Sequence, residues 1–133
     1  MSRIIENKAK NYLFNEFKNE NFSFKDKLKG ETGFDIWLID KNSGKSQKIE
    51  LKATEGKYLK QSDIFQKLYF SALNEKDNFN NKETKIVRIF LGNNPPILFI
   101  FDNEIFSKGA KFEPEGRWVI KGVKNYDAIN EIL

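Results

Sequence analysis

An acidic residue and a lysine, Glu50 and Lys52, lie one residue apart in a segment with strand character. Residues 46–53 predict a strand, in which successive side chains point to opposite faces. Glu50 and Lys52 would then stand side by side on one face, about 6–7 Å apart, while their apolar neighbours enter a core. We call these two residues the acid–lysine pair. The pair presents a carboxylate and an ammonium group to the same space.

A second carboxylate lies upstream, on a segment that predicts the partner strand. Residues 34–40 are apolar with strand character, and residues 41–45 are rich in turn-forming Asn, Ser and Gly. Two strands joined by a short turn that contains glycine predict a β-hairpin. Asp35 falls at the start of the first strand, so an antiparallel hairpin brings it near the end of the second.

The register of this hairpin decides how Asp35 meets the acid–lysine pair. Pairing Asp40 with Ser46 would place Asp35 opposite Leu51, the residue between the two members of the pair. A shift of one residue moves a side chain to the other face of a sheet. Proximity along the strands therefore follows from the pattern, whereas the face that Asp35 occupies does not.

Two carboxylates beside a lysine suit metal-assisted hydrolysis of a phosphate ester. Carboxylates bind hard divalent cations, and such a cation polarises a phosphate and activates water. A lysine can orient that water or offset charge at phosphorus. The chain has no cysteine and no histidine, which excludes thiolate sites, Ser-His catalysis and the usual zinc hydrolase sites. The expected cofactor is therefore Mg²⁺ or Mn²⁺, with Ca²⁺ as the other oxygen-preferring cation.

The charge balance permits a nucleic-acid partner without establishing one. The formal net charge is +4. Lys57, Lys60 and Lys67 follow the second strand and could contact phosphates, although an exposed lysine-rich loop explains them equally well. Gln66 is a further candidate contact.

Three other residues have more than one interpretation. Trp37 and Tyr69 could stack on bases, but packing in the core or at its rim is favoured. Arg88 lies on an otherwise apolar strand, where a buried guanidinium needs a partner. That partner is either a core acid or a phosphate.

The periodicity predicts one α/β domain over residues 1–133, with a mixed sheet and helices on both faces. The expected helices are residues 2–20, 62–76, 103–108 and 126–133. The expected strands outside the hairpin are residues 85–91, 97–101 and 118–120. No window is apolar for the roughly 18 residues that a membrane span needs, and the N-terminus lacks a signal-peptide core, so a cytoplasmic protein without membrane contact is expected.

The string Gly33-Phe34-Asp35, followed after a gap by Glu50-Leu51-Lys52, resembles the PD-(D/E)XK nuclease superfamily. That group includes restriction endonucleases and Holliday junction resolvases, and the chain also resembles the nuclease-like domain at the C-terminus of No Vein-type proteins. The resemblance covers roughly residues 3–75. It implies a restriction endonuclease-like core of helix, three-stranded meander, helix and further strand. One meander strand is not evident, unless residues 22–28 supply it.

The resemblance also implies roles for individual residues. Asp35 would be the central metal ligand, Glu50 the second ligand, and the backbone carbonyl of Leu51 the third. Lys52 would be the catalytic lysine. Glu6, on the first helix, sits where many members carry another acid that binds or positions a metal, although it could equally be a solvated ion-pair partner of its helix neighbours.

Two features depart from the family pattern. The proline that names the motif is Phe34 here. Some nuclease families carry a Gln-x-x-x-Tyr motif on the second helix, whereas Gln66 and Tyr69 are one residue too close. Gln66 is therefore a candidate contributor and not a motif match.

The function that follows is a Mg²⁺-dependent endonuclease acting on DNA, for which the resemblance allows a homodimer with two sites that cut two strands. A second hypothesis is a catalytically silent nuclease-fold module that binds nucleic acid or a protein partner. A third is a small accessory or immunity-type protein in which the acids are only surface charge.

Overall fold

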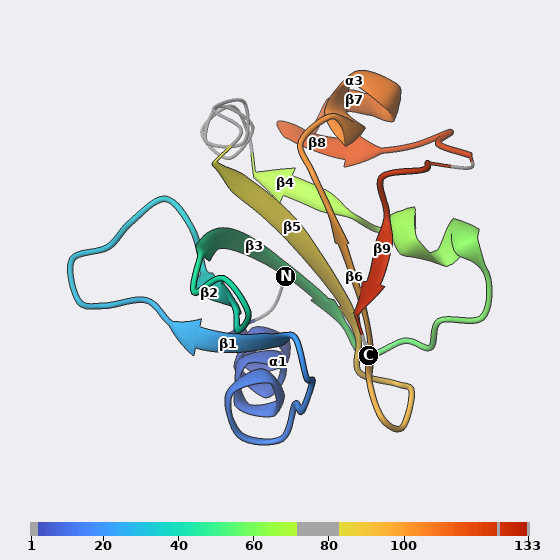
Figure 1. Cartoon of the computed structure of the whole chain (residues 1–133). Coiled ribbons are helices and arrows are strands. Elements are labelled where there is room, and N and C mark those ends of the chain that lie inside the picture. The colour runs from blue at the N-terminus through green and yellow to red at the C-terminus, as the bar shows by residue number, and fades with distance from the viewer. Residues whose placement is uncertain (1–2, 72–82, 125, 133) are drawn as a thin grey trace.

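The computed structural model describes residues 3–71, 83–124 and 126–132, which form a mixed α/β structure made mostly of strands. A six-stranded mixed sheet curls into a half-barrel, and a small three-stranded sheet lies beside it (Figure 1). The helical elements are α1 (Arg3–Asn15), the 3-10 helix η1 (Gln61–Phe65) and α3 (Ile105–Gly109). The strands are β1 (Phe22–Asp26), β2 (Ile36–Asp40), β3 (Ser46–Thr54), β4 (Tyr69–Ser71), β5 (Thr84–Phe90), β6 (Ile97–Phe101), β7 (Ala110–Glu113), β8 (Arg117–Ile120) and β9 (Asn130–Ile132).

The first three strands form an antiparallel meander, which confirms the predicted hairpin and shows that residues 22–26 supply its additional strand. The predicted register was wrong by one residue, because Ser46 pairs with Ile39 and not with Asp40. Asp40 instead belongs to the turn: its Oδ1 accepts the backbone N–H of Asn42 at 2.9 Å, and its own N–H donates to the Lys45 carbonyl. An Asp side chain that binds the backbone two residues ahead favours a turn. The turn therefore starts one residue earlier than the hydrophobic pattern indicated.

The long strand β3 lies in the middle of the large sheet, whose order is β1-β2-β3-β5-β6-β9. It pairs with β5 in parallel, and this register places Lys52 beside Arg88 and Glu50 beside Ile86. The remaining pairs, β5 with β6 and β6 with β9, are antiparallel.

Helix α1 packs against one face of this sheet, below β1 and β3 in Figure 1. Its buried residues Ala9 and Leu13 meet side chains that point to one face of the strands. We call this mostly aliphatic group the aliphatic core. Its buried members are Ala9, Leu13, Phe24, Ile36, Leu38, Ile49, Leu51, Ala53, Val87, Ile89, Leu98 and Ile132.

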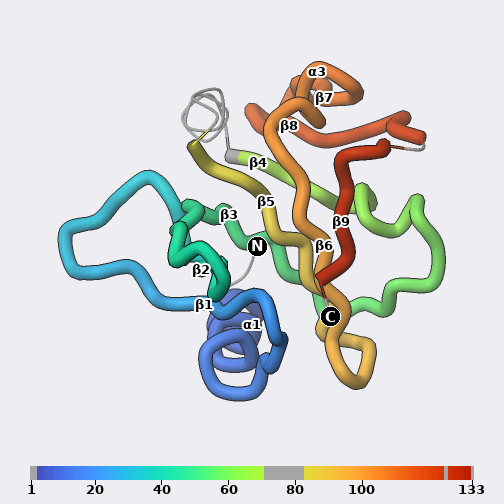
Figure 2. Tube along the Cα trace, in the orientation of Figure 1, coloured from blue at the N-terminus to red at the C-terminus, as the bar shows by residue number. Residues whose placement is uncertain are grey.

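The opposite face of the sheet packs against a different set of elements: η1, α3 and the sheet of order β4-β8-β7. In Figure 2 the chain rises from β6 to α3, forms β7 and β8, and returns as β9 beside β6. We call the buried group on this side the aromatic core. Its buried members are Ile64, Phe65, Leu68, Phe70, Ile86, Phe90, Phe99, Phe101, Ile105, Phe106, Ile120 and Tyr126.

The predicted helix over residues 62–76 was wrong in its described part; residues 72–76 lie outside the described residues. Only η1 is helical, and the chain is extended at Gln66 and left-handed at Lys67 (φ 52°). Strand β4 then pairs with β8, which buries Phe70 completely. Pairing with a segment distant in sequence and burial of a phenylalanine therefore override a local helical pattern.

The predicted terminal helix over residues 126–133 was also wrong; residue 133 lies outside the described residues. Asn130–Ile132 adds an edge strand to β6 and buries Ile132 in the aliphatic core. The expectation of helices on both faces therefore holds in part, since a small sheet covers much of the second face.

Other predicted elements are confirmed with small changes of boundary. The first helix ends at Asn15 and not at residue 20, and its predicted start at residue 2 lies outside the described residues. The short helix predicted at residues 103–108 is α3, and the strands predicted after the hairpin are β5, β6 and β8. Among the described residues, no helix is long and apolar enough to cross a membrane.

Candidate active site

Asp35, just before β2, is tied to β3 by two hydrogen bonds. Its N–H donates to the Ile49 carbonyl, and its Oδ2 accepts the N–H of Leu51, both at 2.8 Å. Ile49 is also the register partner of Ile36, so two consecutive residues face one residue of β3. This is the geometry of a β-bulge, which redirects a side chain at the end of a strand. The bulge holds the Asp35 carboxylate against the edge of β3.

The carbonyl of Leu51 faces the same edge. In an extended strand one residue directs its N–H and its C=O to the same side. The Leu51 N–H bonds Asp35, and β2 pairs with β3 only as far as Ile49. The Leu51 carbonyl oxygen therefore lies on the side of β3 that carries the Asp35 carboxylate. A carboxylate and a backbone carbonyl on one edge are both oxygen ligands for a hard cation.

The acid–lysine pair lies on one face of β3, as predicted from strand geometry. Lys52 Nζ is 3.3 Å from Glu50 Oε1, and the side chains are 10% and 12% exposed, respectively. The ammonium group also lies 4.6 Å from the centre of the Phe70 ring, in the aromatic core. The third hypothesis, which treats the acids as surface charge, does not fit this burial. Two charged side chains that are buried lose their hydration, and this cost must be offset by their mutual attraction and by hydrogen bonds.

Glu6 is not positioned with the pair. Its Oε1 lies 3.8 Å from Lys10 Nζ, one helical turn along α1. Helix α1 packs on the aliphatic core, which is the face of β3 opposite to the pair. The structure therefore supports the ion-pair alternative for Glu6. Within the described residues no group of three acidic side chains could hold a metal ion.

Arg88 extends the charged face onto the neighbouring strand. The parallel register places it beside Lys52, and it is 4% exposed. Its Nη2 donates to the Gln66 carbonyl at 2.7 Å. Burial lowers the pKa of the guanidinium to about 10, so it remains charged at neutral pH. The alternative of a core acid finds no support, since no described carboxylate forms an ion pair with Arg88.

Three of the four candidate nucleic-acid contacts line one small pocket next to Arg88. They are Lys57, Gln66 and Lys67, whereas Lys60 does not line it. The pocket has a volume of about 210 Å³, and its lining residues are Thr54, Gly56, Lys57, Asp63, Gln66, Lys67, Arg88 and Phe90. We call it the β3–β5 pocket. The sequence indicated Lys57, Gln66 and Lys67 as separate candidate contacts, but it did not predict that they line one pocket.

The two aromatic residues that could stack on bases make packing contacts. Trp37 lies edge-on to Phe34 at 4.8 Å between ring centres, and its Nε1 donates to Glu31. Tyr69 carries the Arg117 guanidinium 4.0 Å from its ring centre. The favoured packing interpretation is confirmed for Trp37, and one ring face of Tyr69 is covered by Arg117.

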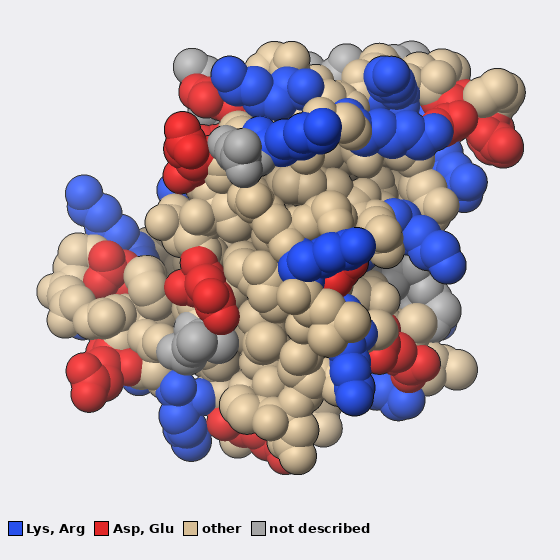
Figure 3. Space-filling model, turned by 90° about the vertical axis from the view of Figure 1, so that its right-hand side faces the viewer, with Lys and Arg blue, Asp and Glu red and all other residues tan. Residues whose placement is uncertain are grey.

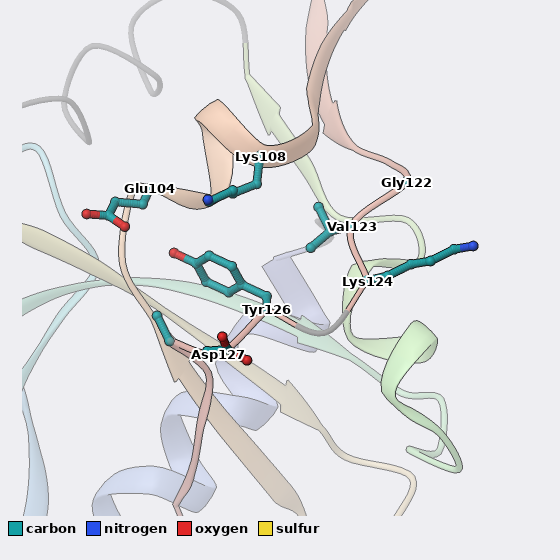
Figure 4. A pocket seen from close by; sticks show the side chains of 8 residues that line it. Glu104, Lys108, Gly122, Val123, Lys124, Tyr126 and Asp127 are labelled. Atoms are coloured by element: carbon teal, nitrogen blue, oxygen red, sulfur yellow. The ribbon is translucent and has the colours of Figure 1, made fainter.

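A larger pocket of about 440 Å³ lies elsewhere, between α3 and residues 122–128. Figure 4 shows Tyr126 lying across it below Lys108, whereas Lys124 extends away from it. The Tyr126 hydroxyl donates to Asp102, and burial together with this bond raises the pKa of Tyr126. The Tyr126 hydroxyl, which stays neutral and is bonded to Asp102, has a structural role. No pattern in the sequence predicted this bond.

Basic side chains also gather on the surface near this second pocket. Figure 3 shows lysine and arginine side chains along the upper part of one face, where α3, β7 and β8 lie in Figure 1. Lys121, which follows β8, forms an ion pair with Glu113 of β7.

Comparison with protein-family models, with curated proteins and with solved structures finds no match to this chain. The functional conclusion therefore depends on the geometry described above.

Proposed function

We propose that this chain is a metal-dependent nuclease that hydrolyses phosphodiester bonds, with DNA as its substrate. The observation that carries the proposal is the hydrogen bond from Leu51 N–H to the Asp35 carboxylate. This bond brings an acid from outside β3 to the residue between Glu50 and Lys52. The three side-chain types needed for metal-assisted phosphate chemistry thereby meet at one strand.

The order of the elements supports the proposal. Helix α1, the meander β1–β3 and the further strand β5 follow one another as the superfamily resemblance implies. Asp35 precedes the second meander strand and the acid–lysine pair lies on the third, an arrangement that supports the proposal. Between β3 and β5 the described residues form η1 and β4, whereas residues 72–82, which include part of the expected second helix, lie outside the described residues.

The donor chemistry fits a hard divalent cation such as Mg²⁺ or Mn²⁺. Asp35, Glu50 and the Leu51 carbonyl offer oxygen atoms only, which such cations prefer. The cation would polarise the scissile phosphate and lower the pKa of a water molecule. The bond that Asp35 accepts from Leu51 fixes the orientation of its carboxylate before any ligand arrives.

Lys52 is the residue that would act on the reacting groups. Its ammonium group can donate hydrogen bonds to an attacking water or to the phosphate oxygens on which charge develops. Lys52 as a whole residue is 8% exposed, and this burial strengthens the interaction because water screens it less. Glu50 orients the ammonium group through their ion pair.

The experiment is a cleavage assay with Mg²⁺ and with Mn²⁺ on supercoiled, linear, single-stranded and four-way-junction DNA, and on RNA. We expect Lys52→Met and Asp35→Asn to reduce cleavage at least about 100-fold, the range for loss of a group that assists proton transfer. The matched control is Lys48→Met, a lysine on the same strand that pairs with Glu83 at 3.6 Å. Equal trace cleavage by the parent chain and both variants would refute the proposal.

One observation favours the second candidate, a silent module that binds nucleic acid without cutting it. The acid–lysine pair is buried and internally paired, and the described residues contain no three-acid metal group. A gel-shift assay on the same DNA forms separates the two candidates. DNA binding without cleavage under either metal, unchanged in Asp35→Asn, would support the module.

A further inference from the structure

The β3–β5 pocket contains more positive than negative charge. Lys57, Lys67 and Arg88 are cationic, and Asp63 is the one acid among its lining residues. The lysines come from the segments on either side of η1, and Arg88 comes from the middle of β5. The segments that flank η1, together with the more distant strand β5, thus bring cations to one small space.

Arg88 has an unused donor. Its Nη2 bonds the Gln66 carbonyl, but its Nε is buried and has no hydrogen-bond partner. Buried polar groups in proteins are nearly always hydrogen-bonded, so an exception points to a missing partner. A guanidinium presents its donors in a planar fork that matches the oxygens of a phosphate.

Asp63 does not neutralise the pocket. Its Oδ2 accepts the N–H groups of Leu59 and Lys60 at 2.9 and 3.0 Å. These bonds lower the pKa of Asp63, so it stays ionised and engaged with the backbone turn before η1. The formal charge of the titratable lining residues remains +2, from three cations and one acid.

The size of the pocket indicates a single small group. Its volume of about 210 Å³ lies below the roughly 300–1,000 Å³ of pockets that enclose drug-sized ligands. An oxyanion fits such a space, whereas a whole nucleotide would extend beyond it.

The pocket adjoins the acid–lysine pair. Arg88 is the register partner of Lys52, and Thr54, another lining residue, is two positions beyond Lys52 on β3. Two residues along a strand span about 6–7 Å. An anion in the pocket would therefore lie next to the proposed reaction centre and not within it.

We propose that the β3–β5 pocket binds a phosphate group through Arg88, Lys57 and Lys67. In a nuclease this group is a phosphate of the DNA strand next to the one that is cleaved. That identification rests on the proposed function, whereas phosphate binding itself does not. The site would hold the strand in position while the acid–lysine pair faces the neighbouring phosphate.

The test uses NMR on the isotope-labelled full chain in EDTA, so that hydrolysis does not occur. The probes are inorganic phosphate, a short single-stranded DNA with a 5′-phosphate, and the same DNA with a 5′-hydroxyl. We expect the Arg88 Nε–H signal to shift with at least one probe. The variants Arg88→Met and Lys67→Asn should weaken that binding at least tenfold. Asn is chosen because it tolerates the left-handed backbone of Lys67.

The matched control is Lys111→Gln, an exposed lysine on β7 outside the pocket, which should bind as the parent chain does. A preference for the 5′-phosphorylated DNA identifies a terminal phosphate, and equal shifts with both DNAs identify a backbone phosphate. A response to inorganic phosphate alone supports the phosphate site and removes DNA as its source. If Arg88→Met does not fold, Lys67→Asn and Lys57→Gln carry the test.

An unmoved Arg88 signal with all three probes, or unchanged binding by the pocket variants, would overturn the phosphate site. These results are separable from the cleavage assay. Phosphate binding without cleavage overturns only the nuclease, and cleavage that needs Lys52 without any response at Arg88 overturns only the pocket.

Discussion

The two faces of β3 are both buried, yet their chemistry differs. Toward α1 the strand presents Ile49 and Leu51, each fully buried in the aliphatic core. Toward the aromatic core it presents Glu50 and Lys52, and β5 adds Arg88 beside them. One face is built from hydrocarbon alone, and the other holds an ion pair and a buried guanidinium.

This difference predicts that the aliphatic face of β3 contributes more to the stability of the fold than the charged face does. Burying an aliphatic side chain stabilises a fold by about 1.5–3 kcal/mol. Replacing a buried ion pair with apolar residues is often neutral or stabilising, so such a pair is weak evidence for a role in stability. Stability alone therefore gives little physical reason for the charged face. The predictions below test that division, from the largest expected effect to the smallest.

The largest effect is expected on the aliphatic face. Leu51→Ala should lower the free energy of unfolding by about 2–5 kcal/mol, because it leaves a cavity in a fully packed core. Urea denaturation followed by circular dichroism measures the change. The control is Leu59→Ala, whose side chain is 80% exposed and whose loss should change stability by less than about 0.5 kcal/mol. Equal effects would mean that the aliphatic core is not formed as described.

On the charged face, replacing one member of the acid–lysine pair should lower the free energy of unfolding. Replacing both members should leave that free energy unchanged or raise it. Lys52→Met leaves the Glu50 carboxylate buried without its ammonium partner, at a cost of about 3 kcal/mol. Adding Glu50→Leu should restore stability to the level of the parent chain or above it. A double-mutant cycle in urea measures the coupling. Additive losses would mean zero coupling, and would show that the two side chains stabilise the fold independently and not through their ion pair.

Alkaline pH should lower stability through Tyr126 on the aromatic side. The pKa of Tyr126 is raised above its ordinary value by burial and by its bond to Asp102. Because the unfolded chain releases this proton near pH 10, the associated stability is complete below that pH and is lost as the pH rises. Absorbance at 295 nm should show late ionisation of Tyr126 and also of Tyr12, whose pKa is raised by burial and by the nearby Glu16.

Tyr126→Phe should remove one late ionisation, leave that of Tyr12, and reduce the alkaline loss of stability. The matched control is Ile49→Val on the aliphatic face, which should lower stability without changing its pH dependence. An alkaline loss of stability that is unchanged in Tyr126→Phe would assign the effect to another residue.

The smallest effect is expected at the turn before η1. Two backbone N–H groups lower the pKa of Asp63, so its contribution is present above about pH 4 and disappears as the pH falls. Asp63→Ala should therefore be less stable than the parent chain at pH 7 but equal to it near pH 2. Urea titrations at both values measure this, with the exposed Glu115→Ala as the control. A deficit that persists at pH 2 would mean that the side chain acts through packing and not through its charge.

The sequence predicted those parts of the fold whose signal is local. Alternation around Glu50 and the turn formers after Asp40 indicated β2 and β3, because side-chain period and turn chemistry are properties of neighbouring residues. Strand β4 and strand β9 escaped prediction. Each has three residues in a helix-like pattern, and each is decided by its pairing with a distant strand, β8 or β6.

The same division holds at the candidate site. Residue spacing alone placed Glu50 and Lys52 on one face of a strand, since strand geometry leaves no alternative. The position of Asp35 required the tertiary structure, because a one-residue change of register and a bulge decide where its carboxylate lies. Glu6 shows the opposite outcome: its sequence position suggested the site, but α1 packs on the other face of β3.

The sequence by itself therefore determined which side chains are available: carboxylates and lysines, no histidine, no cysteine, and an acid–lysine pair on one strand face. Only the tertiary structure decided which other residues join that pair. It brought Asp35 to Leu51, placed Arg88 beside Lys52, and gathered Lys57 and Lys67 around one pocket. The physical reason is that these contacts join segments far apart in the chain, and the register and packing that create them depend on the whole core and not on any local pattern.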